Sequence, residues 1–192
     1  LKNYKPNVPT YWFKVAVNSA PIGVIYNYVP DTAKAKVNDD GKVVVTLGDS
    51  DNYAEFDVYP VVIDKWFVDQ KLGGTAPAKL DKAAKEQIAA AAGVADFETL
   101  LTTPYSGVSY MTTADFNFNQ MGNNWLTGGS NLITAAAVDT EQKTLNGKTV
   151  NVIKQQVRVD KGRLNNNTVG LKAGNGDFNN LPTTSRHLSK ID

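Results

Sequence analysis

The segment YAEFDVYPVVI, residues 53–63, carries the clearest structural signal in the sequence. In its first half polar and apolar residues alternate, so that Glu55 and Asp57 fall on one parity and Phe56 falls on the other. Successive side chains of a β-strand point to opposite faces of the sheet, so this alternation predicts a strand with one face toward solvent. The segment 42–47, KVVVTL, precedes it across the turn GDSDN, and we expect residues 42–47 and 53–59 to pair as a hairpin.

Further strand signals occur on both sides of this segment. Runs rich in β-branched and aromatic residues are typical of strands, and they occur at 11–17, 21–29, 108–118, 131–138, 149–159 and 167–172. The dipeptide Asn146-Gly147 comes directly before one of these runs. Asn-Gly is a strong marker of a tight hairpin turn, so a hairpin is expected there.

Two helices are expected in the middle of the chain. The longer covers 77–93, with Pro77 at its start and Gly93 at its end, which is the usual asymmetry of helix termini. The shorter covers 95–101, where Asp96 is suited to be the N-cap residue.

Together these signals predict a mainly β (α+β) fold. We expect an antiparallel β-sandwich of about seven strands, with a helical insertion near residues 77–101. A length of 192 residues suits a single domain, 1–192. The termini, 1–17 and 178–192, carry no helical pattern and are expected to be extended.

The composition excludes several classes of function. The formal net charge is +1, which argues against a nucleic-acid-binding protein, and the basic residues within 141–172 are expected on solvent-facing strand positions. Cysteine is absent and His187 is the single histidine, so thiol chemistry and multi-histidine metal sites are excluded. No apolar run approaches about 20 residues, so no membrane span is expected. We therefore predict a non-enzymatic protein with no cofactor and no metal.

A segment with almost no charge, 102–129, concentrates aromatic, amide and glycine residues. Trp125 lies there between Asn-Asn and Gly-Gly, so it is expected in a loop. A loop tryptophan among polar residues is a candidate surface contact residue, although the pattern favours a role in capping the core. If Trp125 binds a ligand, the protein is a carbohydrate-binding or adhesin module that recognises host glycans or proteins. A virion capsid or tail protein would have the same β-rich, cysteine-free profile.

Three motifs resemble the fimbrillins of Bacteroidales, the subunits of cell-surface fimbriae. VADFETLL followed by YMTT, at 94–101 and 110–113, resembles the short helix and following strand of that family. VNVIKQQVRVDK, at 150–161, is similar to its valine-rich strand, and FNNLPTTSRHLSK, at 178–190, is similar to its Asn-centred turn.

The resemblance implies a structural subunit of an extracellular fibre, made as a lipoprotein precursor and exposed on the cell surface in association with the outer membrane. Its partners would be other copies of itself or related fimbrial subunits. Such subunits polymerise when a sheet edge accepts a strand from the next subunit. Both termini are candidates for this exchange, and the N-terminal strand would use the residues of one parity, namely Tyr11, Phe13, Val15 and Val17.

Overall fold

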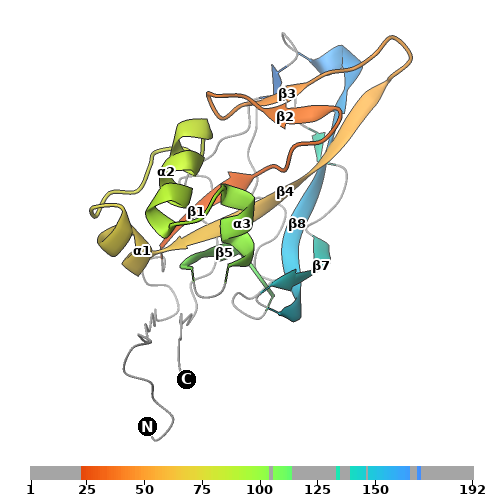
Figure 1. Cartoon of the computed structure of the whole chain (residues 1–192). Helices are drawn as coiled ribbons and strands as arrows, with labels where there is room; N and C mark the ends of the chain where they lie inside the picture. The colour runs from red at the N-terminus through yellow and green to blue at the C-terminus, as the bar shows by residue number, and fades with distance from the viewer. Residues whose placement is uncertain are drawn as a thin grey trace, which may run out of the picture.

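Two long antiparallel strands, β4 and β8, run through the centre of the fold (Figure 1). The computed structural model describes residues 23–103, 106–113, 133–134, 139–145, 147–164 and 168–169. The strands are β1 (Gly23–Tyr28), β2 (Ala35–Val37), β3 (Val43–Val45), β4 (Tyr53–Asp64), β5 (Val108–Tyr110), β6 (Ile133–Thr134), β7 (Asp139–Leu145), β8 (Lys148–Asp160) and β9 (Thr168–Val169). The helices are α1 (Lys65–Lys71), α2 (Lys82–Ala92), α3 (Phe97–Thr102) and a 3-10 turn (Lys161–Arg163). The predicted mainly β, antiparallel class is therefore confirmed for the described residues.

The main sheet contains six strands and forks along β4. The first half of β4, residues 53–58, pairs directly with residues 155–160 of β8. The second half, residues 59–64, pairs with β1 on one side and with β5 on the other. Beyond this point β4 and β8 no longer pair with each other, and β5 with residues 111–112 lies between them.

Pro60 stands where this fork opens. The backbone N–H of Met111 donates to the Pro60 carbonyl at 3.0 Å. A regular antiparallel pair would return a bond from Pro60, but proline has no N–H. The Met111 carbonyl instead accepts from the backbone N–H of Ile153 on β8, at 2.9 Å. A proline is tolerated inside this strand because its missing donor falls where the ladder changes partner.

A tight hairpin joins β7 to β8. The two strands pair along the whole of β7, and Leu145 lies opposite Lys148. Gly147 in the connecting turn has a φ of 79°, a left-handed conformation that favours glycine. The hairpin predicted at this Asn-Gly pair is confirmed. The strand β7 itself, DTEQKTL, escaped prediction because nearly all of its residues are polar.

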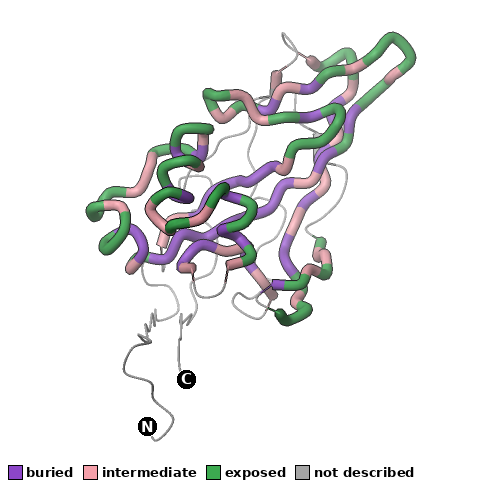
Figure 2. Tube along the Cα trace, viewed as in Figure 1, coloured by how far each residue is buried: buried purple, intermediate pink, exposed green. Residues whose placement is uncertain are grey.

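A second sheet of three strands, in the order β2-β3-β9, packs on one face of the main sheet. Ala35, Val43 and Val45 from this sheet are buried in one cluster with Phe56 of β4 and Val157 of β8. Figure 2 shows the buried residues running along these strands where the two sheets meet. This cluster is the first of two cores.

The hairpin expected between residues 42–47 and 53–59 is wrong. Among the described strands, β3 pairs with β2 and β9, whereas β4 pairs with β1, β5 and β8. The tight turn comes one step earlier, where the side-chain oxygen of Asn38 accepts the N–H groups of Asp40 and Lys42 at 3.0 and 2.9 Å. Both NDDG and GDSDN have turn chemistry, and composition alone does not tell which of them closes a hairpin.

Helix α2 lies within the expected range 77–93 but begins later than predicted. Asp81 is its N-cap, because its carboxylate accepts the backbone N–H of Ala84 at 2.8 Å. Pro77 therefore precedes the helix. Gly93 ends it with a φ of 75°, as expected for a C-terminal glycine.

Helix α3 agrees closely with the range 95–101 expected for it. Its predicted N-cap, Asp96, accepts the backbone N–H of Thr99 at 2.8 Å. Helix α1 was not predicted, and it follows β4 directly with Phe67 and Val68 buried. Its seven residues are too few to show a helical period in the sequence.

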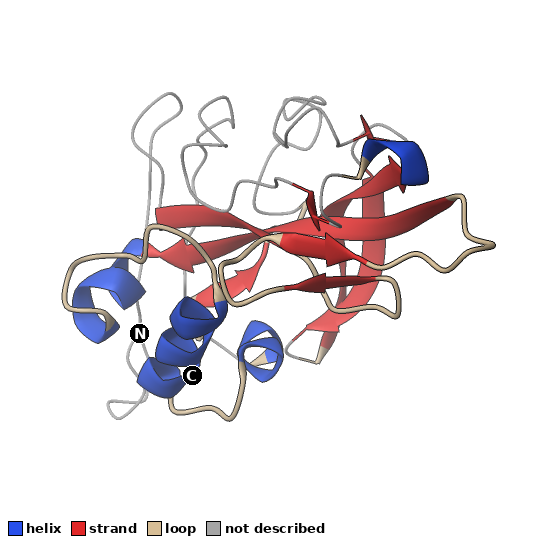
Figure 3. Ribbon diagram, turned by 90° about the horizontal axis from the view of Figure 1, so that it is seen from above, coloured by secondary structure: helices blue, strands red, loops and turns tan. Residues whose placement is uncertain are grey.

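The helices α1 to α3 gather on one side of the main sheet (Figure 3). They cover the second half of β4, where Tyr59, Val61 and Ile63 share a buried cluster with Ile88 of α2 and Leu100 of α3. Among the described helices, none covers the corresponding face of the first half of β4, where alternate residues remain exposed. The two halves of one strand therefore lie in different environments.

Candidate functional site

Along residues 53–57, one edge of β4 has no partner among the described strands. Lys161 donates its N–H to the Asn52 carbonyl at 2.8 Å, so these two residues form a hydrogen-bonded pair in the register of β4 with β8. Bonded and non-bonded pairs alternate along antiparallel strands, so the odd-numbered residues here direct their backbone groups away from β8. Tyr53, Glu55 and Asp57 thus present unpaired N–H and C=O groups, and no other described residue engages them. We call this the 53–57 edge.

The ladder with β1 stops short of this edge because of a proline. The last pair joins Tyr28 of β1 to Tyr59 of β4. Continued in register, Pro30 would lie opposite Asp57, where an N–H is needed. Proline cannot supply it, so the chain leaves the ladder and continues to β2.

The 53–57 edge is accessible, unlike the outer edge of β1. Tyr53 is 39% exposed and the Asp57 side chain is 31% exposed. β1 also lies at the end of the strand order, but residues 25–29 are at most 6% exposed. The edge of β4 is therefore the one that a further strand could approach.

A concavity of about 440 Å³ opens beside this edge. Its lining includes Tyr53 and Glu55 of β4 together with Lys34, which precedes β2. Lys34 Nζ lies 3.0 Å from Asp51 Oδ1. Glu55 makes no ion pair with any residue that the structure describes. Glu55 lies directly opposite Arg158 in the register of β4 with β8, so a cation on the neighbouring strand faces this acidic side chain.

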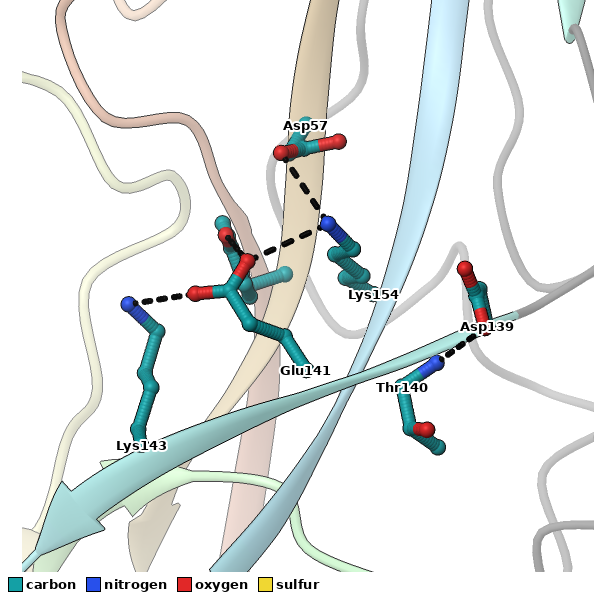
Figure 4. Close-up of polar contacts among 7 residues, drawn as sticks. Asp57, Asp139, Thr140, Glu141, Lys143 and Lys154 are labelled. Carbon is teal, nitrogen blue, oxygen red and sulfur yellow. Dashed lines mark hydrogen bonds and ion pairs between the residues drawn. The ribbon is translucent and has the colours of Figure 1, made fainter.

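A network of polar groups lies on the face of the main sheet that carries the Asp57 side chain (Figure 4). Glu141 of β7 accepts a hydrogen bond from the Tyr59 hydroxyl at 2.8 Å and another from Lys154 of β8 at 3.1 Å. Lys143 Nζ lies 3.0 Å from the second carboxylate oxygen of Glu141. Lys154 Nζ also lies 3.4 Å from Asp57 Oδ2. These contacts join β4, β7 and β8.

The network fixes the charge states of its members. Burial raises the pKa of Glu141, but hydrogen bonds from Tyr59 and two lysines outweigh it and hold that pKa at about 2. Burial and the bond to Glu141 raise the pKa of Tyr59 well above its usual value. Burial lowers the pKa of Lys154, but Glu141 and Asp57 outweigh it and raise that pKa overall. A general acid or base needs a pKa near the working pH, so these groups are suited to holding strands together.

An aromatic cluster continues from this network beneath the helices. Tyr59 and Tyr110 meet edge to face, with ring centroids 5.4 Å apart, and Lys143 Nζ lies 5.2 and 5.1 Å from the two centroids. Tyr28 packs against Tyr110 and donates its hydroxyl proton to Glu98 of α3. These rings are almost wholly buried, so they contribute to packing and offer no open stacking surface.

Several residues singled out from the sequence lie outside the described residues. They are Trp125, the strand-exchange residues Tyr11, Phe13, Val15 and Val17, and the terminal segment 178–192. Among the basic residues within 141–172, Lys148 and Lys161 are exposed, as expected. Lys143 and Lys154 are only partly exposed, because they belong to the Glu141 network.

The sequence contains a signal for the open edge that periodicity alone misses. Pro30 follows an apolar strand, and its missing N–H ends one ladder partway along β4. The Glu141 network also has a signal, since Glu141 and Lys143 share one parity on β7. Neither signal identifies the neighbouring strand, so neither could be interpreted without the register.

No protein-family model, no curated protein and no solved structure matches this chain. Within the described ranges, no helix is long and apolar enough to cross a membrane. The same residues contain no group of three or more histidine, cysteine or carboxylate side chains placed to hold a metal ion. Any function assigned to the protein therefore rests on its own residues.

Proposed function

We propose that the protein is a non-enzymatic structural subunit of an extracellular fibre and that its copies join by strand exchange or edge complementation. The observation that carries this proposal is the 53–57 edge. It presents unpaired backbone donors and acceptors at an accessible position, and a strand from another chain satisfies such groups directly.

The remaining geometry supports a structural role. Glu141, Lys143 and Lys154 are engaged in contacts between strands, and the tyrosines near them are packed in the core. We also infer that the two sheets form a β-sandwich, since β2 and β3 bury their apolar residues against β4 and β8. A sandwich with an unfilled edge is a common architecture for strand acceptance.

The fimbrial assignment draws on the resemblance to Bacteroidales fimbrillins. It places the mature subunit on the cell surface, in a fimbrium associated with the outer membrane, with copies of itself or related subunits as partners. The first resembling segment, VADFETLL followed by YMTT, is expected to be a short helix and then a strand. The order of α3 at 97–102 and β5 at 108–110 is consistent with it.

Electron microscopy of the purified full chain tests the proposal. The chain is incubated alone and with related fimbrial subunits, and the expected result is filaments with a regular axial repeat. A protein that stays monodisperse by light scattering in both cases would contradict a fibre function. A glycan array of wild type and Trp125→Ala, run on the same preparation, separates an adhesin from a fibre subunit.

A further inference from the structure

Tyr53 is the exposed large apolar side chain of the described residues, with 39% of its surface open to solvent. Its ring borders the concavity of about 440 Å³ that opens beside the 53–57 edge. Small-molecule sites have volumes of about 300–1,000 Å³, so this concavity is large enough to hold a ligand. We propose that it binds an uncharged carbohydrate, with Tyr53 stacked against a sugar ring. The inference goes beyond the proposed fibre function and does not depend on it.

The polar groups around the Tyr53 ring match the chemistry of a sugar. Apart from Tyr53, the lining consists of polar residues, namely Lys34, Ser50, Asp51, Asn52 and Glu55. Their carboxylates accept hydrogen bonds, the ammonium donates them, and the hydroxyl and amide do both. A sugar ring has hydroxyl groups around its rim and C–H groups on its faces, and a tyrosine ring offers a rigid surface for such a face. An apolar ligand would instead leave these polar groups desolvated without partners.

The charges at the concavity favour an uncharged ligand over a charged one. The lining contains two carboxylates and one ammonium, and Lys34 already lies 3.0 Å from Asp51, so an anion is disfavoured. A cation is disfavoured because Arg158 already meets the demand for one. Arg158 lies opposite Glu55 in the register of β4 with β8, and its guanidinium lies 3.9 Å from the centroid of the Tyr53 ring.

The turn that carries several of these polar groups, residues 48–52, is held in place by its own contacts. It lies in the connection between β3 and β4 (Figure 1). The Gly48 N–H donates to the Asp51 carboxylate at 2.8 Å, and the backbone N–H of Lys161 donates to the Asn52 carbonyl at 2.8 Å. The bonds from Gly48 and Lys34 also hold the pKa of Asp51 below its usual value, so this acceptor stays ionised. A site whose groups are already fixed loses little conformational freedom when a ligand binds.

An array of neutral oligosaccharides, printed beside sialylated and sulfated ones, tests the assignment with the full-length chain. The expected result is binding to one or more neutral glycans, and the oligosaccharide bound is then titrated by isothermal calorimetry. Tyr53→Leu should weaken binding about five- to tenfold, because the aromatic contact is lost. Tyr53→Phe keeps the ring and should bind nearly as well as wild type. Circular dichroism checks that both variants are folded.

A pair of amide variants separates the lining from the rest of the surface. Asn52→Ala should weaken binding, because it removes a polar side chain from the concavity. Gln87→Ala is the matched control, since Gln87 is an exposed amide on α2, outside the concavity. Equal effects of Asn52→Ala and Gln87→Ala would count against this site.

Three further results would overturn the inference. They are the absence of binding to any neutral glycan, binding of Tyr53→Leu as tight as that of wild type, and loss of binding in Trp125→Ala but not in Tyr53→Leu. Tyr53→Leu keeps the backbone groups of the 53–57 edge, so it should still form filaments if the fibre proposal is correct. Filament formation and glycan binding are therefore measured on the same variant, and either proposal can fail without the other.

Discussion

The two halves of β4 differ in nearly every respect although they belong to one strand. Residues 59–64 are buried on both faces and have a partner strand on each side. Residues 53–58 are buried on one face only and have a described partner, β8, on one side only. The first set is part of the core, and the second set forms a boundary with solvent.

The local sequence pattern of each half accounts for this difference. YAEFDV alternates between polar and apolar residues, which is typical of a strand with one covered face. YPVVID is nearly continuous in apolar residues, which is typical of a strand covered on both faces. The position at which alternation ends therefore marks where the helices begin to cover the sheet.

The largest expected effect is in the buried half. Ile63→Ala removes a side chain that is 0% exposed, and it should destabilise the fold by about 2–5 kcal/mol because a cavity remains. Glu55→Ala, in the other half, should change stability by no more than about 0.5 kcal/mol. Urea unfolding followed by tryptophan fluorescence measures both. Similar midpoints for the two variants would refute the contrast between the halves.

The close approach of β1 to the second half of β4 provides the next test. A Cβ added at Gly23 would lie 1.9 Å from the backbone oxygen of Ile63. Gly23→Ala must push the strands apart, and we expect a loss of about 1–3 kcal/mol. Gly162→Ala is the matched control, since no atom lies within 4 Å of its added Cβ. Thermal unfolding should show a lower Tm for Gly23→Ala alone, and an unchanged Tm would mean that β1 does not pack as described.

Glu141, which bonds Tyr59 where the two halves of β4 meet, makes the stability depend on pH. The folded pKa of Glu141 is about 2, below the value of about 4.3 expected when unfolded. The unfolded state therefore takes up the proton first as the pH falls. The stabilisation is fully present above about pH 4.5 and is lost as the pH falls toward 2. Because the side chain is 31% exposed, we expect a contribution of about 1–2 kcal/mol rather than the full linkage value.

Glu141→Gln is the variant that checks this pH dependence. Urea unfolding from pH 5 to pH 2 should show wild type losing more stability than Glu141→Gln, because the glutamine amide does not bind a proton in this range. Glu86→Gln is a suitable control, since Glu86 lies exposed on α2. If Glu141→Gln and wild type lose the same stability over this range, Glu141 is not held ionised by the network.

Local features of the fold could be predicted from the sequence, whereas its pairings could not. The N-cap at Asp96 and the turn at Gly147 depend on neighbouring residues only, and both were predicted. The partner of β3 depends on contacts far along the chain: Val43 pairs with Val169 and not with a residue of β4. Turn residues are abundant here, so the sequence offers several hairpins of similar quality.

The candidate site was harder to predict than the fold for the same reason. Alternation at Glu55 and Asp57 identifies the solvent face of the strand, but it does not reveal which edge lacks a neighbour. That depends on where the ladder with β1 ends, which Pro30 determines. An edge is a property of register, and register requires knowledge of both strands.

The smallest expected effect concerns the open end of β4. The Arg158 guanidinium lies 3.9 Å from the centroid of the Tyr53 ring, and both side chains are substantially exposed. A cation–π contact at such a site contributes about 0.5–1 kcal/mol, so Tyr53→Leu should lose about that amount and Tyr53→Phe should lose less. Urea unfolding of the two variants measures the difference. A loss for Tyr53→Leu as large as that for Ile63→Ala would mean that solvent does not weaken this contact. The first half of β4 would then be a core element, with no edge to offer to another chain.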